Sequence, residues 1–225
     1  MTGTGRGVGA DPTAIRSQVK RLPENAVNDP AVLAAVLDAG VVAHVGVVQD
    51  GWPYVVPVGY APWRDGILIH GSTASRLFKL LAAGAPACVT VTHLDGLSLA
   101  RSAFHSSMEY RTAMLFGTFV PVTGEDKATA LADITEHLLP GRWQHVRHPT
   151  AQEDKATSVL HLVPVDWSVK ISEGFEDESD DIAAYPQLWA GRVPLRVVAG
   201  EPIPDAGADH VPLPEHVAEL TRARR

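Results

Sequence analysis

Three Asp-Gly pairs divide the first half of the chain into short β-type runs, and this spacing constrains the fold more than any other feature. The pairs Asp50-Gly51, Asp65-Gly66 and Asp95-Gly96 each stand between runs rich in aliphatic and aromatic residues. Asp-Gly is a strong signal for a tight turn between antiparallel strands. Repeated turns of this kind predict an antiparallel meander, which closes most economically into a small barrel.

A few helices are expected around these strands. Residues 30–39 have helical periodicity, with Asp29 as the cap and Pro30 at the first position. A second helix is predicted for 125–139, capped by Thr123. The fold class is therefore mainly β (α+β), with antiparallel strands and peripheral helices. Strands are expected at 41–49, 54–60, 67–70, 87–93, 97–104, 110–122 with a break at Gly117, and 158–171 with a bulge or edge at Pro164.

Composition excludes several classes of function. A net charge of -7 argues against generic binding to nucleic acid or to an anionic membrane, because both reward clustered Lys and Arg. No run approaches the roughly 18 consecutive apolar residues of a membrane span. The single cysteine, Cys88, lies in an apolar run and cannot form an intrachain disulfide, which favours a reducing, cytoplasmic location.

The segment from Ile67 to Leu81 joins a β-type run to a helical stripe through the turn His-Gly-Ser-Thr-Ala-Ser. Free N–H groups at the start of a helix favour anions, and Arg76 and Lys79 would add full positive charges there. Phosphate is the expected ligand. The alternative is that Ser72, Thr73 and Ser75 only cap their own helix.

The order of these motifs resembles the flavin-binding split-barrel family related to pyridoxamine 5'-phosphate oxidase, in particular the branch of nitroimidazole-resistance-type reductases. The resemblance rests on the strand that ends in His-Gly, the Thr-Ala-Ser-Arg helix start, and the run from His105 to Thr112 leading into Phe116-Gly117. The late segment from Leu188 to Leu195 resembles the Trp-Ala-Gly…Pro-Leu signature of that branch. The resemblance as a whole spans roughly residues 16–200.

The resemblance implies an FMN-binding split β-barrel that forms a homodimer with a flavin at the subunit interface. Main-chain groups of one hairpin strand would contact the isoalloxazine ring, and Arg76 would hold the phosphate in a bidentate fork. Polar residues of the long central strand would face the flavin or its ribityl chain. The cofactor-binding residues carried over are Val55, Val56, Val58, His70, Gly71, Ser75, Arg76, Lys79, Tyr110, Arg111 and Thr112.

His70 is the candidate catalytic residue, because an imidazole beside a flavin can donate a proton near neutral pH. Its other interpretation is a neutral histidine satisfied by a carbonyl. The expected function is an oxidoreductase that passes electrons from a nicotinamide donor to a small organic acceptor. The alternative is a non-catalytic flavin or haem protein, in which His70 is the preferred iron ligand. A deazaflavin would need more basic residues than Arg76, Lys79 and Arg111.

The domain organisation follows from the same pattern. Residues 1–15 are expected to be a flexible leader, 16–200 the FMN-binding split-barrel domain and 201–225 a C-terminal tail. The acidic run 173–181 is expected to be a solvated loop. True pyridoxamine phosphate oxidation is disfavoured, since Arg192-Val193-Pro194-Leu195 stands where that enzyme needs an Arg-Leu-Xaa-Pro segment. The histidines of 143–148 lack the carboxylate of a zinc motif, and no metal site is predicted.

Overall fold

A computed structural model describes residues 16–174 and 177–223. Its strands pair in antiparallel fashion, and its buried apolar residues form two clusters. The predicted leader lies outside the described residues. The strands are β1 (Ala26–Val27), β2 (Val42–Gln49), β3 (Trp52–Trp63), β4 (Gly66–Ser72), β5 (Pro86–Leu99), β6 (Ser107–Pro121), β7 (Thr157–Leu162), β8 (Asp166–Ser172) and β9 (Gly191–Pro194). The helices are α1 (Pro30–Asp38), α2 (Arg76–Ala82), α3 (Glu125–Leu138), α4 (Ala151–Ala156), α5 (Ser179–Ala184) and α6 (Glu215–Ala223), with 3-10 turns at Pro23–Asn25 and Trp143–His145.

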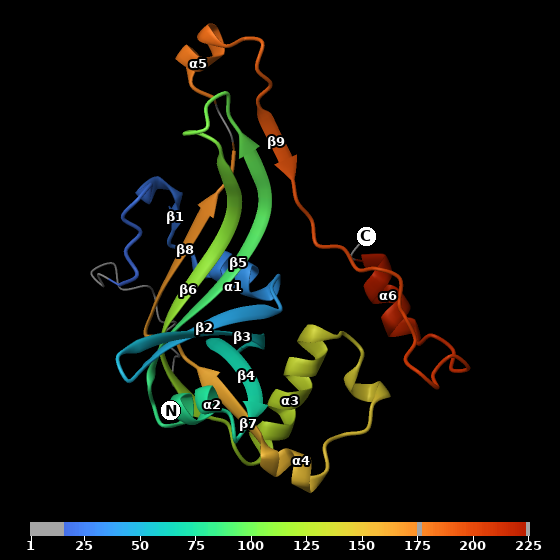
Figure 1. Cartoon of the computed structure of the whole chain (residues 1–225). Helices are drawn as coiled ribbons and strands as arrows, with labels where there is room; N and C mark the ends of the chain where they lie inside the picture. Colours follow the sequence, from blue (N-terminus) through green and yellow to red (C-terminus); the bar gives the residue numbers. More distant parts are fainter. Residues whose placement is uncertain (1–15, 175–176, 224–225) are drawn as a thin grey trace, which may run out of the picture.

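The strand pairing closes on itself and confirms the predicted split barrel. Antiparallel pairs run from β5 through β6, β7, β4, β3 and β2 and return to β5. β6 also pairs with β8, and β5 with β9, so the long β5–β6 hairpin projects from the ring towards α5, while α2, α3 and α4 lie at the other end (Figure 1). The core inside the ring is aliphatic and includes Val45, Ile67, Ile69, Val89, Leu115 and Leu160.

The first two Asp-Gly turns form as predicted, and the third does not. Asp50 and Gly51 both have positive φ between β2 and β3, and Arg64 has positive φ before Asp65 and Gly66. Asp95, by contrast, is the extra residue of a bulge inside β5, since Leu94 pairs with Tyr110 and Gly96 with Glu109. Continuous pairing with β6 outweighs the local turn preference there.

Other local expectations are corrected by the tertiary pairing. β6 runs unbroken through Gly117, where a Cβ would lie 2.9 Å from the Val163 carbonyl oxygen. The predicted strand 158–171 is two strands on either side of Pro164, because β7 pairs with β4 whereas β8 pairs with β6. Gly124, not Thr123, is the N-cap of α3. Asp29 caps α1 as expected, accepting a bond from the Ala31 N–H.

Two segments after the barrel contact earlier parts of the chain. Part of the acidic run is held at the hairpin tip, where the Arg101 guanidinium contacts the Asp177 carboxylate at 2.7 Å, so the expected solvated loop is wrong for this part. The predicted tail contains α6, whose His216 ring stacks on His145 with centroids 4.4 Å apart. Across the described ranges, no helix is both long and apolar enough to span a membrane.

Candidate functional site

The start of α2 and the start of β3 come together in the folded chain. The Arg76 guanidinium lies over the Tyr54 ring, with its carbon 3.8 Å from the ring centroid. Arg76 and Lys79 are both exposed, and no acidic side chain in the described part of the chain pairs with either of them. The stacked guanidinium therefore keeps its hydrogen-bonding edge free for an anion.

Ser75 does not serve its own helix. It occupies the N-cap position of α2, yet its side chain makes no capping hydrogen bond. The turn is held instead by the backbone, because the Ser75 N–H donates to the Ser72 carbonyl, and by the Ser72 hydroxyl, which accepts from the Ala74 N–H. The simple capping interpretation thus fails for Ser75, and its hydroxyl remains available beside Arg76.

β3 has an open edge next to these side chains. Trp52–Gly59 pairs with β2 on one side, whereas β4 pairs only with Tyr60–Trp63. Within the described residues, the other side of the first half of β3 therefore has main-chain groups without a strand partner. Val55 is 65% exposed, while Val56 and Val58 pack against the core and offer only their backbone.

A largely apolar cavity of about 550 Å³ adjoins this edge. Its walls come from β2, β3, β5 and β6, from the residue before β8 and from Arg16. Tyr54 and Val55 line it, so the cavity and the Arg76–Tyr54 contact share one segment of β3. Other wall residues are Val47, Val48, Ala87, Phe116 and Val165.

His70 faces a different cavity, of about 500 Å³, which shares no lining residue with the first. Leu131, Trp143 and Val146 line it together with Arg147 and Glu153. The His70 ring is partly exposed and makes no hydrogen bond or ion pair within residues 16–174 and 177–223. Partial burial of the ring lowers its pKa, which favours the neutral imidazole.

The charged wall of this second cavity is internally paired. Arg147 holds Glu153 through two hydrogen bonds of 2.7 and 2.6 Å. The guanidinium lowers the pKa of the Glu153 carboxyl to about 2, with the Thr150 N–H as a further donor. The Trp143 ring stacks on His148 with centroids 4.5 Å apart. An aromatic and aliphatic wall with one ion pair at its edge suits a planar, mainly apolar ligand.

Gly71 has a packing role. A Cβ at this position would lie 2.3 Å from the Phe78 ring. The close approach of Phe78 to the backbone of β4 sets the position of α2, and with it the positions of Ser75 and Arg76.

Three predicted residues of β6 lie apart from both cavities. The Arg111 guanidinium grips the Asp95 carboxylate with hydrogen bonds of 2.9 and 2.8 Å, which lowers the pKa of Asp95. The Thr112 hydroxyl donates to the Val91 carbonyl at 3.0 Å. Tyr110, Arg111 and Thr112 line neither cavity.

Within one chain, the fold places Val55, Ser75 and Arg76 around the β3–α2 contact, and it places His70 at a different cavity. Sequence reasoning missed Tyr54 as the platform of Arg76, because no local pattern links positions 54 and 76. It also missed Arg147 and Glu153 beside His70, although the Thr150-to-Glu153 spacing is a capping-box signal that marks the helix presenting Glu153.

Comparison with known proteins finds a matching family model and similar solved structures. A family model described as pyridoxamine 5'-phosphate oxidase matches residues 29–171. The FAD and haem binding protein from Mycobacterium smegmatis is 41% identical, with a TM-score of 0.83 over 88% of this chain and 97% of that chain. The flavocytochrome Anf3 from Azotobacter vinelandii is 36% identical, with a TM-score of 0.85 over 94% and 98% of the two chains.

A third structure shows the fold alone. It is described as a 5-nitroimidazole antibiotic resistance protein from Bacteroides thetaiotaomicron, and is 20% identical with a TM-score of 0.55 over 65% of this chain and 86% of that chain. No curated protein matches.

Proposed function

Because the chain belongs to the pyridoxamine 5'-phosphate oxidase family, we propose that it is a redox protein that binds a flavin nucleotide and haem. The family resemblance expected from the sequence is confirmed. Two relatives above 30% identity are named as an FAD and haem binding protein and as a flavocytochrome. The proposal assigns one cofactor to each of the two cavities.

The contact of Arg76 with Tyr54 carries the flavin assignment. It brings the predicted phosphate ligand to the strand whose free backbone edge would meet the isoalloxazine ring. Val55 and the apolar cavity beside it would cover the ring, and Ser75 and Arg76 would bind the phosphate. A bound flavin would supply the exchange of one or two electrons.

The cavity beside Val55, together with Ser75 and Arg76, would hold the isoalloxazine ring and first phosphate that FMN and FAD have in common. The sequence resemblance predicts FMN. The relative at 41% identity is named for FAD, and we therefore propose FAD. Lys79, which is exposed on α2, would help to hold its adenylate half.

We assign haem to the cavity of His70. The ring nitrogens are unpartnered in the described chain, and burial keeps the imidazole neutral, which is the form that binds iron. Leu131, Trp143 and Val146 supply an apolar wall. The separation of His70 from the flavin cavity favours this role over proton donation to a flavin-bound substrate.

Homodimerisation is proposed as well. Large apolar side chains stand free on the segment after β8, where Trp189 is 68%, Val197 95% and Ile203 91% exposed. This segment runs away from the sheet between β9 and α6 (Figure 1). A second copy of this chain would cover these side chains.

In the proposed reaction, electrons would pass from a nicotinamide donor to a small organic acceptor.

The spectrum of the purified protein tests the cofactor assignment. We expect flavin bands together with a Soret band, and FAD as the flavin released on denaturation and identified by mass spectrometry. His70→Ala should remove the Soret band and keep the flavin, whereas His44→Ala, at an exposed histidine of β2, should change neither. A full Soret band in His70→Ala would refute the ligand assignment, and release of FMN alone would refute FAD.

A further inference from the structure

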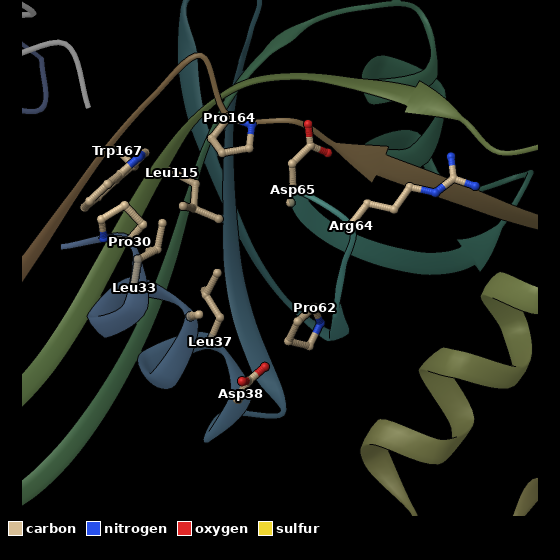
Figure 2. Close-up of a pocket in the computed structure, with 12 residues that line it drawn as sticks. Pro30, Leu33, Leu37, Asp38, Pro62, Arg64, Asp65, Leu115, Pro164 and Trp167 are labelled. Carbon is tan, nitrogen blue, oxygen red and sulfur yellow. The ribbon is translucent and has the colours of Figure 1, made fainter. Parts of the chain in front are cut away.

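A third cavity, of about 320 Å³, opens between α1, the β3–β4 turn and the connection from β7 to β8 (Figure 2). Its walls are apolar and include Pro30, Leu33, Leu37, Leu115, Pro164 and Trp167. Leu37, Leu115 and Trp167 are themselves core residues, between 1% and 6% exposed, so the floor of the cavity is the barrel core. None of its lining residues lines the two cavities assigned above.

Two carboxylates stand at the edge of this apolar space. Asp38 is the last residue of α1, and Asp65 lies in the β3–β4 turn. Figure 2 shows them on opposite sides of the cavity, with the Arg64 side chain directed away from it. Arg64 is occupied elsewhere, because its guanidinium lies 3.8 Å over the Trp63 ring and 3.1 Å from the Asp126 carboxylate.

Neither carboxylate is neutralised by a neighbour. The ion-pair contact of Asp65 in the described residues is with His161, whose Nε2 lies 3.8 Å away, and burial lowers the pKa of that ring, which favours its uncharged form. Asp38 forms no ion pair within the part of the chain that the structure describes. It also sits at the negative end of a helix whose last turn holds no basic residue. A carboxylate there opposes the helix dipole.

We propose that this cavity binds a small hydrophobic primary amine, whose alkyl or aryl body fills the apolar space while its ammonium group lies at the edge, where the carboxylates of Asp38 and Asp65 attract it from opposite sides. A volume near 320 Å³ is at the lower end of the range for small-molecule sites. An alcohol of the same length would lose the charge attraction, and a carboxylic acid would be repelled. The site is independent of flavin and haem.

The test uses the full-length protein and three six-carbon probes: hexylamine, hexan-1-ol and hexanoate. Binding is followed at pH 7 by calorimetry and by the indole N–H signals in NMR, since Trp167 forms part of the wall. We expect hexylamine to bind about tenfold or more tightly than hexan-1-ol, as for a charge-assisted contact, and hexanoate not to bind. Equal affinity for the amine and the alcohol would overturn the proposal.

Variants locate the site. The double change Asp38→Asn with Asp65→Asn should reduce hexylamine affinity to that of hexan-1-ol and leave the alcohol unchanged. Asp50→Asn, in the turn between β2 and β3, is the matched control because Asn also tolerates the positive φ of that position. Ala34→Phe at the cavity wall should weaken both probes. Unchanged hexylamine binding in the double variant, with a melting temperature equal to wild type, would refute the site.

Discussion

At the scale of single residues, Arg76 offers the sharpest test of the flavin site. Arg76→Ala should weaken binding of FAD or FMN by about 1.5–3 kcal/mol, the usual value of a hydrogen bond to a charged group, while riboflavin binding stays unchanged. Titration of the apo-protein followed by flavin fluorescence measures both. Arg222→Ala removes the same charge from α6 and should have no effect. Equal weakening of riboflavin would mean that Arg76 acts through the fold.

His161 makes stability depend on pH. Burial lowers its pKa in the folded protein, although Asp65 acts in the opposite direction. The unfolded chain therefore takes up a proton at a higher pH than the folded protein does. Stability rises with pH through the window below about 6.5 and is lost as pH falls through it.

His161→Gln should reduce the difference between the melting temperatures at pH 7.5 and pH 5.5. His210→Gln, in an exposed part of the tail, should leave this difference unchanged. A variant that loses as much stability as wild type on acidification would show that other groups, such as His70, carry the pH dependence.

At the scale of elements, the packing of α2 against β4 can be broken at one atom. Gly71→Ala would place a Cβ 2.3 Å from the buried Phe78 ring and so displace α2. We expect a loss of about 1–3 kcal/mol in the free energy of unfolding. Flavin affinity should fall as well, because Ser75 and Arg76 move with the helix.

Urea denaturation and flavin titration measure these two effects. Gly200→Ala is the control, since a Cβ there meets no atom within 4 Å. Gly71→Ala combined with Phe78→Leu should recover part of the stability by making room for the methyl group. No recovery in the double variant would mean that the clash with Phe78 is not the cause.

At the scale of the whole molecule, the exposed segment after β8 predicts the oligomeric state. The wild-type protein should be a dimer at micromolar concentration that buries about 2,000 Å² or more. Val197→Asp with Ile203→Asp should shift it towards monomer, because both side chains are more than 90% exposed in one chain. Light scattering coupled to size exclusion measures the mass.

Leu139→Asp, at an exposed position after α3, is the matched control and should remain dimeric. A dimer that survives both charged substitutions would place the interface elsewhere. A monomeric wild type would remove the dimer proposal altogether, and the flavin site would then have to be complete in one chain.

Local signals determined much of this protein. Asp29 caps α1, and the turns at Asp50-Gly51 and at Arg64-Asp65-Gly66 form as their residues predict, because these interactions span only a few positions. The strand-turn-helix from Ile67 to Leu81 also follows from its own residues. The family resemblance then supplied the barrel topology, which no single segment specifies.

Only the tertiary structure decided the rest. Asp95 becomes a bulge and the partner of Arg111 because β5 and β6 pair continuously on both sides of it. Arg76 contacts Tyr54, and His70 faces a separate cavity, because β3 changes its pairing partner from β2 to β4 at Gly59–Tyr60. These outcomes depend on contacts between residues far apart in the sequence, whose free energies outweigh the small preferences of a turn or a cap.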